Sequence, residues 1–341
     1  MNNLDPKDVE GSTGMLSKQC KQIWEQAKEI NFPDNYKNCK NIVLCGMGGS
    51  AYGGYVVSAL FKEELKVPIY SNNDYHLPEF VDRDTLIILS SYSGTTEEVL
   101  ACTREAQEKN LSITGIGSGG ELGNFLKQNS LPSLIFNPKF NTSGQPRLGT
   151  GYMVLGIVGM LNRMDLMEVS DEEVNQAIDE LDQNQEEIKT SAKELSEKIQ
   201  GFIPLIISAE FLGGNAHILR NQFNETAKSF SAFSELPELN HHLMEGLKNP
   251  SDKKLFVLFI NSDMYSDKLK KRIELTKDVV EKNGITFEEY APSGSSKISQ
   301  MLNVLSLGGY LTLYLAFLYG QDPSLIPWVD YFKEQLNKGG G

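Results

Sequence analysis

Two loops rich in glycine and in hydroxyl side chains have the composition of an anion-binding site. The first is Gly46-Met47-Gly48-Gly49-Ser50, and the second is Ser90-Ser91-Tyr92-Ser93-Gly94-Thr95-Thr96. Each follows a short apolar run typical of a β-strand and precedes a predicted helix, which is where open parallel sheets bind ligands. Glycines let the backbone come close to a ligand, and helix N-termini offer unpaired N–H groups to a phosphate. The pattern therefore predicts a phosphate site.

Both loops also have simpler explanations. A glycine-rich turn after a first strand can serve a dinucleotide or tight packing, and hydroxyls before a helix can cap it, here through Thr95. Capping does not require three further hydroxyls, on Ser91, Ser93 and Thr96, beside a glycine that lets the chain turn tightly around an oxyanion. Neither loop has the lysine of a nucleotide P-loop. The phosphate interpretation is favoured, without a nucleotide.

Composition and charge narrow the class of protein. The chain has 341 residues and 40% apolar content, enough for two hydrophobic cores. A net charge of −13 argues against a nucleic-acid surface but leaves room for a small anion bound by amides and hydroxyls. The four cysteines show no metal-ligand spacing, which favours free thiols in the cytoplasm. Apolar runs such as 41–45 and 255–260 are far shorter than the ~20 residues of a membrane helix, so we expect no membrane partner.

The hydrophobic pattern predicts two series of alternating strands and helices. Expected strands of the first series are 41–45, 67–71, 85–90, 112–115 and 133–136, with helices from near Gly49, Thr95, Glu121 and Thr150. Expected strands of the second are 204–208, 255–261 and 285–290, with helices from near Gly214, Asp267 and Ser296. Short apolar strands between helices indicate parallel sheets covered on both faces. The predicted fold class is α/β, with two three-layer α/β/α sandwich domains.

The expected domain limits follow from these series. We expect one N-terminal helix and a connection at 1–38, a first domain at 39–165, a connecting helix at 166–200, a second domain at 201–336 and a flexible tail at 337–341. The connecting helix begins with the start signal S-D-E-E at Ser170 and is interpreted as solvated. The segments NIVLCGMGGSAYGG and PLIISAEFLGGNAHIL both run from a strand through small residues into a helix. We therefore interpret the domains as duplicated.

Taken together, GMGGS and SYSGTTEE resemble the phosphate-binding signature of the sugar isomerase (SIS) superfamily. A tandem pair of such domains with the motifs that follow resembles the bifunctional phosphoglucose/phosphomannose isomerase family, from about residue 20 to 336. The resemblance implies tandem SIS domains and a sugar-phosphate substrate, with no cofactor. It also implies that the phosphate is held by Gly48, Gly49, Ser50, Ser91, Ser93 and Thr96.

The same resemblance assigns catalytic roles to four later residues. Arg147, in Q-P-R, would stabilise the negative enediolate oxygen. Glu225, at the end of N-Q-F-N-E, would shuttle the proton between C1 and C2, and an ordinary or slightly raised glutamate pKa permits this. His241, in N-H-H, would open the sugar ring, which suits a side chain that titrates near operating pH. Lys333, in V-D-Y-F-K, would assist from the opposite side.

Each catalytic assignment has an alternative. Without the motifs, Arg147 would be interpreted as a surface salt bridge, and Glu225 and Lys333 as solvated helix residues. His242 competes with His241 for ring opening, and two adjacent histidines could also be a metal ligand or a solvated turn. The chain has only four histidines in all and no H-E-x-x-H motif or cysteine cluster, so we expect no metal.

Ile326 departs from the family pattern. Seven residues before the matching lysine, family members that handle both epimers carry threonine, and single-substrate glucose isomerases carry glutamine. The apolar side chain of Ile326 cannot donate a hydrogen bond to a substrate. The ratio of glucose to mannose activity therefore stays open.

The expected function is reversible, metal-independent aldose–ketose isomerisation of a hexose 6-phosphate through a cis-enediol. Glucose 6-phosphate and fructose 6-phosphate are the expected pair, with mannose 6-phosphate also accepted. Family likeness further implies a homodimer in which His241 completes the active site of the neighbouring subunit, and twofold symmetry is the commonest form of oligomer.

Three alternative functions are also considered for this sequence. A sugar-phosphate-sensing SIS protein without catalysis usually carries a basic helix-turn-helix, and the segment before Asn41 is short and not basic. A glutamine-dependent aminosugar synthase needs an N-terminal cysteine, whereas Asn2 follows Met1 here. An isomerase for another phosphosugar typically needs one domain, which would leave Glu225 and His241 without a purpose.

Overall fold

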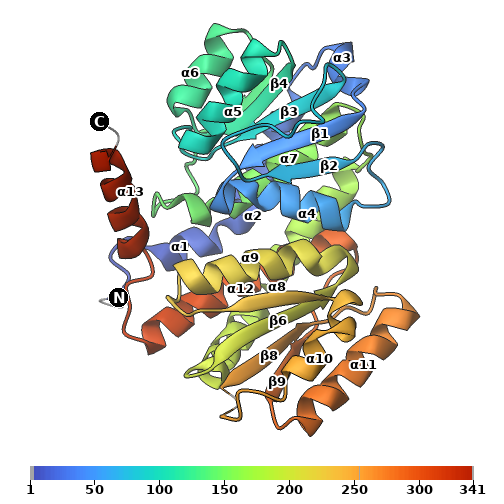
Figure 1. Ribbon diagram of the computed structural model, residues 1–341, viewed down its shortest axis with the longest axis vertical. Helices are drawn as coiled ribbons and strands as arrows, with labels where there is room; N and C mark the ends of the chain where they lie inside the picture. Colours follow the sequence, from blue (N-terminus) through green and yellow to red (C-terminus); the bar gives the residue numbers. More distant parts are fainter. Residues whose placement is uncertain (1–3, 253, 340–341) are drawn as a thin grey trace.

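The computed structural model describes residues 4–252 and 254–339, and it contains two parallel sheets, one above the other in Figure 1. The upper sheet has the strand order β2-β1-β3-β4-β5 and the lower sheet β7-β6-β8-β9, and every strand pair is parallel. The predicted α/β class is confirmed. The strands are β1 (Asn41–Gly46), β2 (Ile69–Asn72), β3 (Thr85–Ser90), β4 (Ser112–Gly117), β5 (Ser133–Ile135), β6 (Ile203–Ala209), β7 (Ala232–Leu236), β8 (Leu255–Ile260) and β9 (Thr286–Tyr290).

Helices cover both faces of the first sheet because side chains alternate along each strand. Val43 and Cys45 point into a cluster with α5 (Glu97–Glu108) and α6 (Gly120–Gln128). Ile42 and Leu44 belong to the main core, to which α4 (Tyr52–Leu60) and α7 (Thr150–Arg163) contribute. The first domain is therefore a three-layer sandwich.

The second sheet has the same layering. Its outer face carries α11 (Asp267–Lys282) and the short α10 (Leu243–Gly246), and its inner side carries α9 (Gly213–Glu225), α8 (Asp171–Ile199) and α12 (Lys297–Leu318) (Figure 1). The helix α12 is long and apolar enough to cross a membrane by length and composition alone. However, 83% of its most apolar window is buried inside the protein, as expected for a core helix.

The structure changes our interpretation of α8. The Ser170 hydroxyl caps the helix by accepting a hydrogen bond from the Glu173 N–H at 3.1 Å, as the start signal predicts. The helix was expected to be a solvated connection, but it packs along α12. Its apolar stripe is buried: Val174, Ala177, Ile178, Leu181, Ile188, Ala192, Leu195 and Ile199. Thus α8 is part of the second domain's core.

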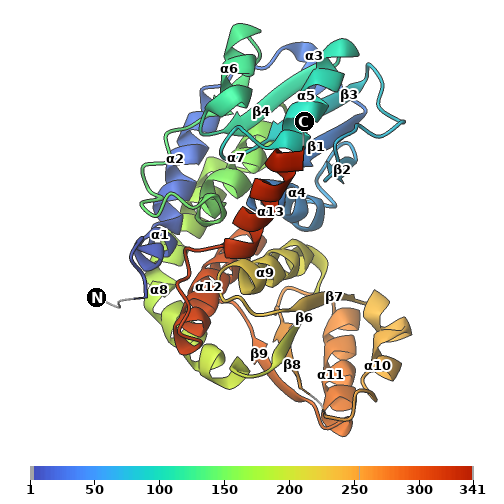
Figure 2. The same ribbon diagram turned by 60° about the vertical axis from the view of Figure 1, so that its left-hand side comes forward.

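The chain ends also differ from expectation. In place of one N-terminal helix, the described residues from 4 to 38 form three, α1 (Val9–Gly14), α2 (Leu16–Lys28) and α3 (Asp34–Lys37). The last helix, α13 (Pro327–Gly339), continues through Gly339, where a flexible tail was predicted, and 340–341 lie outside the described residues. It stands at the left edge of the molecule in Figure 1 and lies in front of the other elements in Figure 2, where that side comes forward.

The two domains meet through their inner helices. In the contact between α4 and α9, an added Cβ at Gly214 would lie 2.4 Å from the Tyr55 carbonyl oxygen, so the two backbones touch there. One continuous hydrophobic cluster runs through both domains. The packing therefore fixes the first sheet relative to α9, and with it the residues at the ends of these elements.

Candidate active site

The first glycine-rich loop packs against the second loop and against Arg147. It continues β1 through the 3-10 helix η1 (Gly48–Ala51), and Gly48 has a left-handed φ of 50° that glycine adopts without strain. The Ser50 hydroxyl accepts a hydrogen bond from the Tyr92 N–H at 2.9 Å. An added Cβ at Gly49 would lie 3.2 Å from the Arg147 Cα. The structure therefore brings three sequence-predicted elements together at one edge of the first sheet.

The second loop holds its hydroxyls close together. The Ser91 and Thr96 hydroxyls are hydrogen-bonded at 2.7 Å, and the Gly94 N–H donates to Ser91 Oγ at 3.0 Å. Gly94 has a φ of 71°, and an added Cβ would lie 1.8 Å from the Gly119 carbonyl oxygen. Only glycine fits this turn, which curls the chain around the hydroxyls.

The capping role expected for Thr95 is wrong. Helix α5 begins at Glu97, so Thr96 occupies the N-cap position, and its side chain makes no capping hydrogen bond. The Thr95 hydroxyl instead lies 3.0 Å from the exposed Ser93 hydroxyl. The first N–H groups of α5 therefore lack a side-chain cap, which is the condition that favours an anion at a helix N-terminus.

Arg147 is buried beside these loops, which excludes the alternative of a surface salt bridge. Its side chain is 6% exposed, and Nη1 donates to Gln145 Oε1 at 3.1 Å. Nη2 donates to the carbonyls of Pro323 and Ser324 at 2.7 and 2.9 Å, while Nε has no hydrogen-bond partner among the described residues. A guanidinium has five N–H donors, so Nε–H and one Nη1–H are left for a ligand. Burial lowers the pKa of Arg147, and the Glu225 carboxylate opposes that shift.

Glu225 is the last residue of α9, and its carboxyl group interacts electrostatically with Arg147 and with two lysines. Its Oε2 atom is buried without a hydrogen-bond partner. Burial raises the pKa of Glu225, and the nearby charges of Arg147, Lys333 and Lys228 work in the opposite direction. A carboxylate that is poorly solvated yet held ionised by cations is a stronger base than an exposed one.

Lys228 is a site residue that the sequence analysis missed. Its ammonium donates to the carbonyl oxygens of Asp322 and Thr226 at 2.6 and 3.0 Å. Burial lowers the pKa of Lys228 to about 8. Its position three residues after Glu225 was the available signal, but a lysine at a helix end is usually solvated, so spacing alone did not single it out.

Lys333 lies on α13, and the segment before this helix is anchored in the site. Arg147 holds the carbonyls of Pro323 and Ser324, and Lys228 holds that of Asp322. The side chain of Lys333 is exposed, and its charge lowers the pKa of Glu225. The structure thus places Lys333 in the electrostatic environment of the Glu225 carboxyl.

His241 is far from this cluster within one chain. It ends the 3-10 helix η4 (Glu238–His241), which follows the carboxyl end of β7 near the start of α9. Glu225 is at the other end of α9, roughly 18 Å away along the helix axis at 1.5 Å per residue. His241 and His242 are both exposed, and His242 Nε2 pairs with Glu238 at 2.6 Å. One chain therefore does not bring His241 to Glu225, Arg147 or Lys333.

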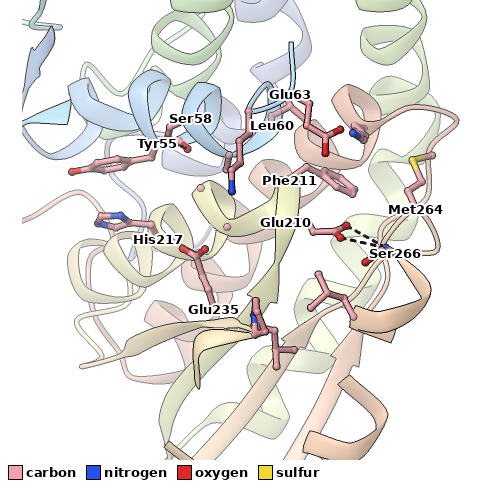
Figure 3. Close-up of a pocket in the computed structure, with 18 of the residues that line it drawn as sticks. Tyr55, Ser58, Leu60, Glu63, Glu210, Phe211, His217, Glu235, Met264 and Ser266 are labelled. Atoms are coloured by element: carbon pink, nitrogen blue, oxygen red, sulfur yellow. Dashed lines mark hydrogen bonds between the residues drawn. The ribbon is translucent and has the colours of Figure 1, made fainter. Parts of the chain in front are cut away.

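A second crevice lies at the carboxyl ends of β6, β7 and β8 (Figure 3). Its volume is about 970 Å³, and it contains none of the candidate site residues. His217 is stacked between Tyr55 at 4.0 Å and Phe233 at 4.7 Å, and burial lowers its pKa to about 4. This crevice is a separate region of the molecule.

The cysteines and acidic side chains form no metal centre in 4–252 and 254–339. All four cysteines are free and buried. No group of three or more His, Cys, Asp or Glu side chains is arranged to hold a metal ion within those ranges.

Comparisons with known proteins show which family and fold this chain resembles. A family model described as the bacterial phospho-glucose isomerase C-terminal SIS domain matches residues 188–336. A bifunctional phosphoglucose/phosphomannose isomerase from Caldicellulosiruptor bescii is 30% identical, with 94% of this chain and 96% of that protein covered. One of the same name from Aquifex aeolicus is 32% identical, with 88% and 91% covered. The C-terminal domain of glucosamine-fructose-6-phosphate aminotransferase from Francisella tularensis shares the fold, with a TM-score of 0.70, 13% identity and 92% and 97% coverage.

The two parallel sheets and the hydroxyl-rich loops define a protein of the tandem SIS class. The relatives of the chain identify a narrower family than its fold does. The chain belongs to the bifunctional phosphoglucose/phosphomannose isomerase family. The predicted family and fold class are thus confirmed, whereas the roles of the individual site residues stay predictions.

Proposed function

We propose that this chain isomerises hexose 6-phosphates, interconverting glucose 6-phosphate and fructose 6-phosphate and also accepting mannose 6-phosphate. The observation that carries the proposal is the buried Glu225 Oε2 atom, which interacts electrostatically with Arg147, Lys333 and Lys228, while Arg147 packs against the first glycine-rich loop. The relatives named above carry both isomerase activities in their names. All four cysteines are free and buried, which supports a cytoplasmic location.

The substrate phosphate binds at the edge of the first sheet. Its oxygens accept hydrogen bonds from hydroxyls and from backbone N–H groups of the two loops, which together suit a dianion. The binding residues are Gly48, Gly49, Ser50, Ser91, Ser93 and Thr96. This site fixes the far end of the sugar, so that C1 and C2 face Glu225.

The proton transfer uses one carboxylate. Glu225 removes the proton from C2 of the open-chain aldose, the electron pair forms the C1–C2 double bond, and O1 takes the negative charge. Arg147 stabilises this oxygen in the enediolate. The same proton returns to C1 while the O2 proton passes to O1, which gives the ketose. No proton or electron is gained or lost overall.

Ring opening requires a second copy of the chain. His241 of the second copy and Lys333 act on the ring oxygen and the anomeric hydroxyl from opposite sides. The supporting observation is that His241 is exposed and lies near the start of α9, whereas Glu225 is at the other end of that helix. A second observation is the apolar surface of α13, whose residues Trp328, Tyr331, Phe332 and Leu336 are 82%, 56%, 62% and 49% exposed. Such a surface beside an unfinished site suits a twofold homodimer with the active site at the interface.

The activity is tested by a coupled assay for fructose 6-phosphate formed from glucose 6-phosphate and, separately, from mannose 6-phosphate, with EDTA present. We expect turnover of both substrates and a loss of about 10²- to 10⁴-fold in kcat for Glu225→Gln. Asn224→Ala, which changes the exposed neighbour on the same helix, is the matched control and should stay active. Absence of turnover with both substrates would remove the proposed function.

The shared site is tested by mixing two inactive variants. Glu225→Gln and His241→Ala are each expected to be inactive, but a mixed dimer contains one site with both an intact Glu225 and an intact His241. After subunit exchange at equal amounts, about a quarter of the wild-type activity should return, because half of the dimers are mixed and each has one working site. No recovery would mean that His241 acts within its own chain or not at all.

A further inference from the structure

Tyr52 occupies the junction between the phosphate loops and the second domain. It is the first residue of α4, two positions after Ser50, and its side chain is 0% exposed. Because α4 packs against α9, the phenol lies near Asn221 and near Glu225, one turn further along α9. No motif points to this residue.

Three buried polar atoms around Tyr52 make no full hydrogen bond to any described residue, although the Asn221 side chain is close enough to the Tyr52 hydroxyl to lower the phenol pKa by a weak hydrogen-bond interaction. They are the Tyr52 hydroxyl, Arg147 Nε and Glu225 Oε2. All three groups interact electrostatically, since the charges of Glu225 and Arg147 both act on Tyr52. More than nine in ten buried polar groups are hydrogen-bonded in folded proteins, and each exception costs stability. A cluster of two donors and one acceptor without partners is therefore a place shaped for polar atoms from outside the chain.

The reacting atoms of the proposed substrate match this cluster. The acceptor, Glu225, needs a C–H proton, and the two donors need an oxygen that becomes negative as that proton leaves. We propose that Tyr52 is the second hydrogen-bond donor, beside Arg147, to the enediolate oxygen formed when Glu225 deprotonates the sugar. This inference rests on the proposed isomerase function and adds a residue that contacts the reacting atoms.

The surroundings suit Tyr52 to donate and not to transfer its proton. Burial and the Glu225 carboxylate raise the pKa of the phenol, so the hydroxyl stays protonated across the working pH range. Protein atoms shield it from water, and a hydrogen bond to a developing anion is stronger in such a place than in solution. The phenol thus supplies a neutral donor beside the charged guanidinium.

The test compares two tyrosines on the same helix. Tyr52→Phe removes the unpaired hydroxyl, and Tyr55→Phe removes one that donates to Asn73 at 3.2 Å and lies at the second crevice. For Tyr52→Phe we expect kcat to fall about 100-fold with a KM changed less than threefold, because an enediolate donor acts mainly in the transition state. Tyr55→Phe should keep kcat within about threefold. A Tyr52→Phe enzyme with wild-type kcat overturns the inference.

Stability and inhibitor binding separate catalysis from structural support. Because the hydroxyl of Tyr52 is buried and unpaired, Tyr52→Phe should have an unchanged or higher Tm, whereas a structural role would lower Tm together with kcat. A hydroxamate analogue of the enediolate, measured by calorimetry, should bind Tyr52→Phe weaker by about the same factor as kcat/KM falls. Unchanged hydroxamate affinity overturns the inference. Wild-type activity on hexose 6-phosphates is the reference, so a wild type without activity would instead indicate failure of the proposed function.

Discussion

The two domains build the same turn after their first strand but place opposite chemistry in it. In the first domain the left-handed position is Gly48, with a φ of 50°, and in the second it is Glu210, with a φ of 44°. The loop before α5 presents hydroxyls at the helix N-terminus. In the second domain the Ser266 N–H, at the start of α11, donates to the two carboxylate oxygens of Glu210 at 3.3 and 3.4 Å. The chain thus supplies its own anion there (Figure 3).

The side chains around the second crevice are also mostly acidic, in contrast to the cations of the candidate active site. The second crevice is lined by Glu63, Glu64, Glu210, Glu235 and Glu238 against Lys62 and Lys297. A left-handed glutamate is strained by roughly 1–2 kcal/mol relative to glycine, so the turn holds its carboxylate at a cost in stability. The acidic lining of the second crevice therefore disfavours a bound phosphate there.

The largest expected difference in kcat is between substitutions of a cation in the candidate active site and of a cation in the second crevice. Arg147→Lys keeps the charge but loses the fork that holds Pro323 and Ser324, and we expect kcat to fall about 10²- to 10³-fold. Lys297→Gln, in the second crevice, should leave kcat within about twofold. Steady-state kinetics on glucose 6-phosphate measure both, with circular dichroism to check folding. Equal losses of kcat in the two variants would mean that the second crevice also takes part in catalysis.

A smaller difference is expected for the hydroxyls. Ser91→Ala removes a hydroxyl from the phosphate loop, and the KM should rise about tenfold, which corresponds to roughly 1.4 kcal/mol for one hydrogen bond to a charged group. Ser266→Ala is the control at the equivalent helix start, where the side chain makes no capping bond, and its KM should not change. A phosphate-loop variant with the wild-type KM would contradict the placement of the phosphate.

The pH dependence should report only the candidate active site. Glu225 must be ionised, so activity rises as pH increases through its raised pKa, and it falls again as Lys228 loses its proton near pH 8. Lys228→Gln should remove the alkaline fall and shift the acid limb upward, because the lysine charge lowers the Glu225 pKa. His217→Gln should change neither limb, since the pKa of His217 is about 4. Profiles of kcat/KM between pH 5 and 10 test this.

The smallest expected effect concerns the shared turn. Gly48→Ala introduces strain at a left-handed position and should destabilise the protein by about 1 kcal/mol, although nothing lies within 4 Å of the added Cβ. Glu210→Gly should change stability in the opposite direction by a similar or smaller amount, because it relieves strain but loses the contact to Ser266. Thermal unfolding at pH 7 compares them. A stabilised Gly48→Ala variant would show that the turns are not equivalent.

Much of the fold could be predicted from the sequence because buried parallel strands are apolar runs. The strand that was not predicted is β7 (Ala232–Leu236), whose sequence AFSEL has no continuous apolar run. The role of α8 was misjudged because periodicity shows which face is apolar but not that α12 covers it. Local pattern therefore located the elements and left their partners undetermined.

The site was predictable only where a motif spans it. The hydroxyl loops were predicted from their composition and their position after apolar strands, and Arg147 and Glu225 were selected by resemblance; in the structure Arg147 packs against the first loop and interacts electrostatically with Glu225. Tyr52 and Lys228 were missed because their importance comes from burial between α4, α9 and the segment before α13. Contacts between elements distant in sequence leave no short-range signal.

The contact between α1 and α12 also has a consequence for synthesis on the ribosome. An added Cβ at Gly309 would lie 2.7 Å from a methyl carbon of Thr13, so the first helix fits tightly against one of the last. At roughly 5–20 residues per second, α1 is made on the order of 15–60 s before its partner emerges. During that time the nascent chain leaves Val9, Ser12 and Thr13, which are buried in the folded protein, without their packing partner.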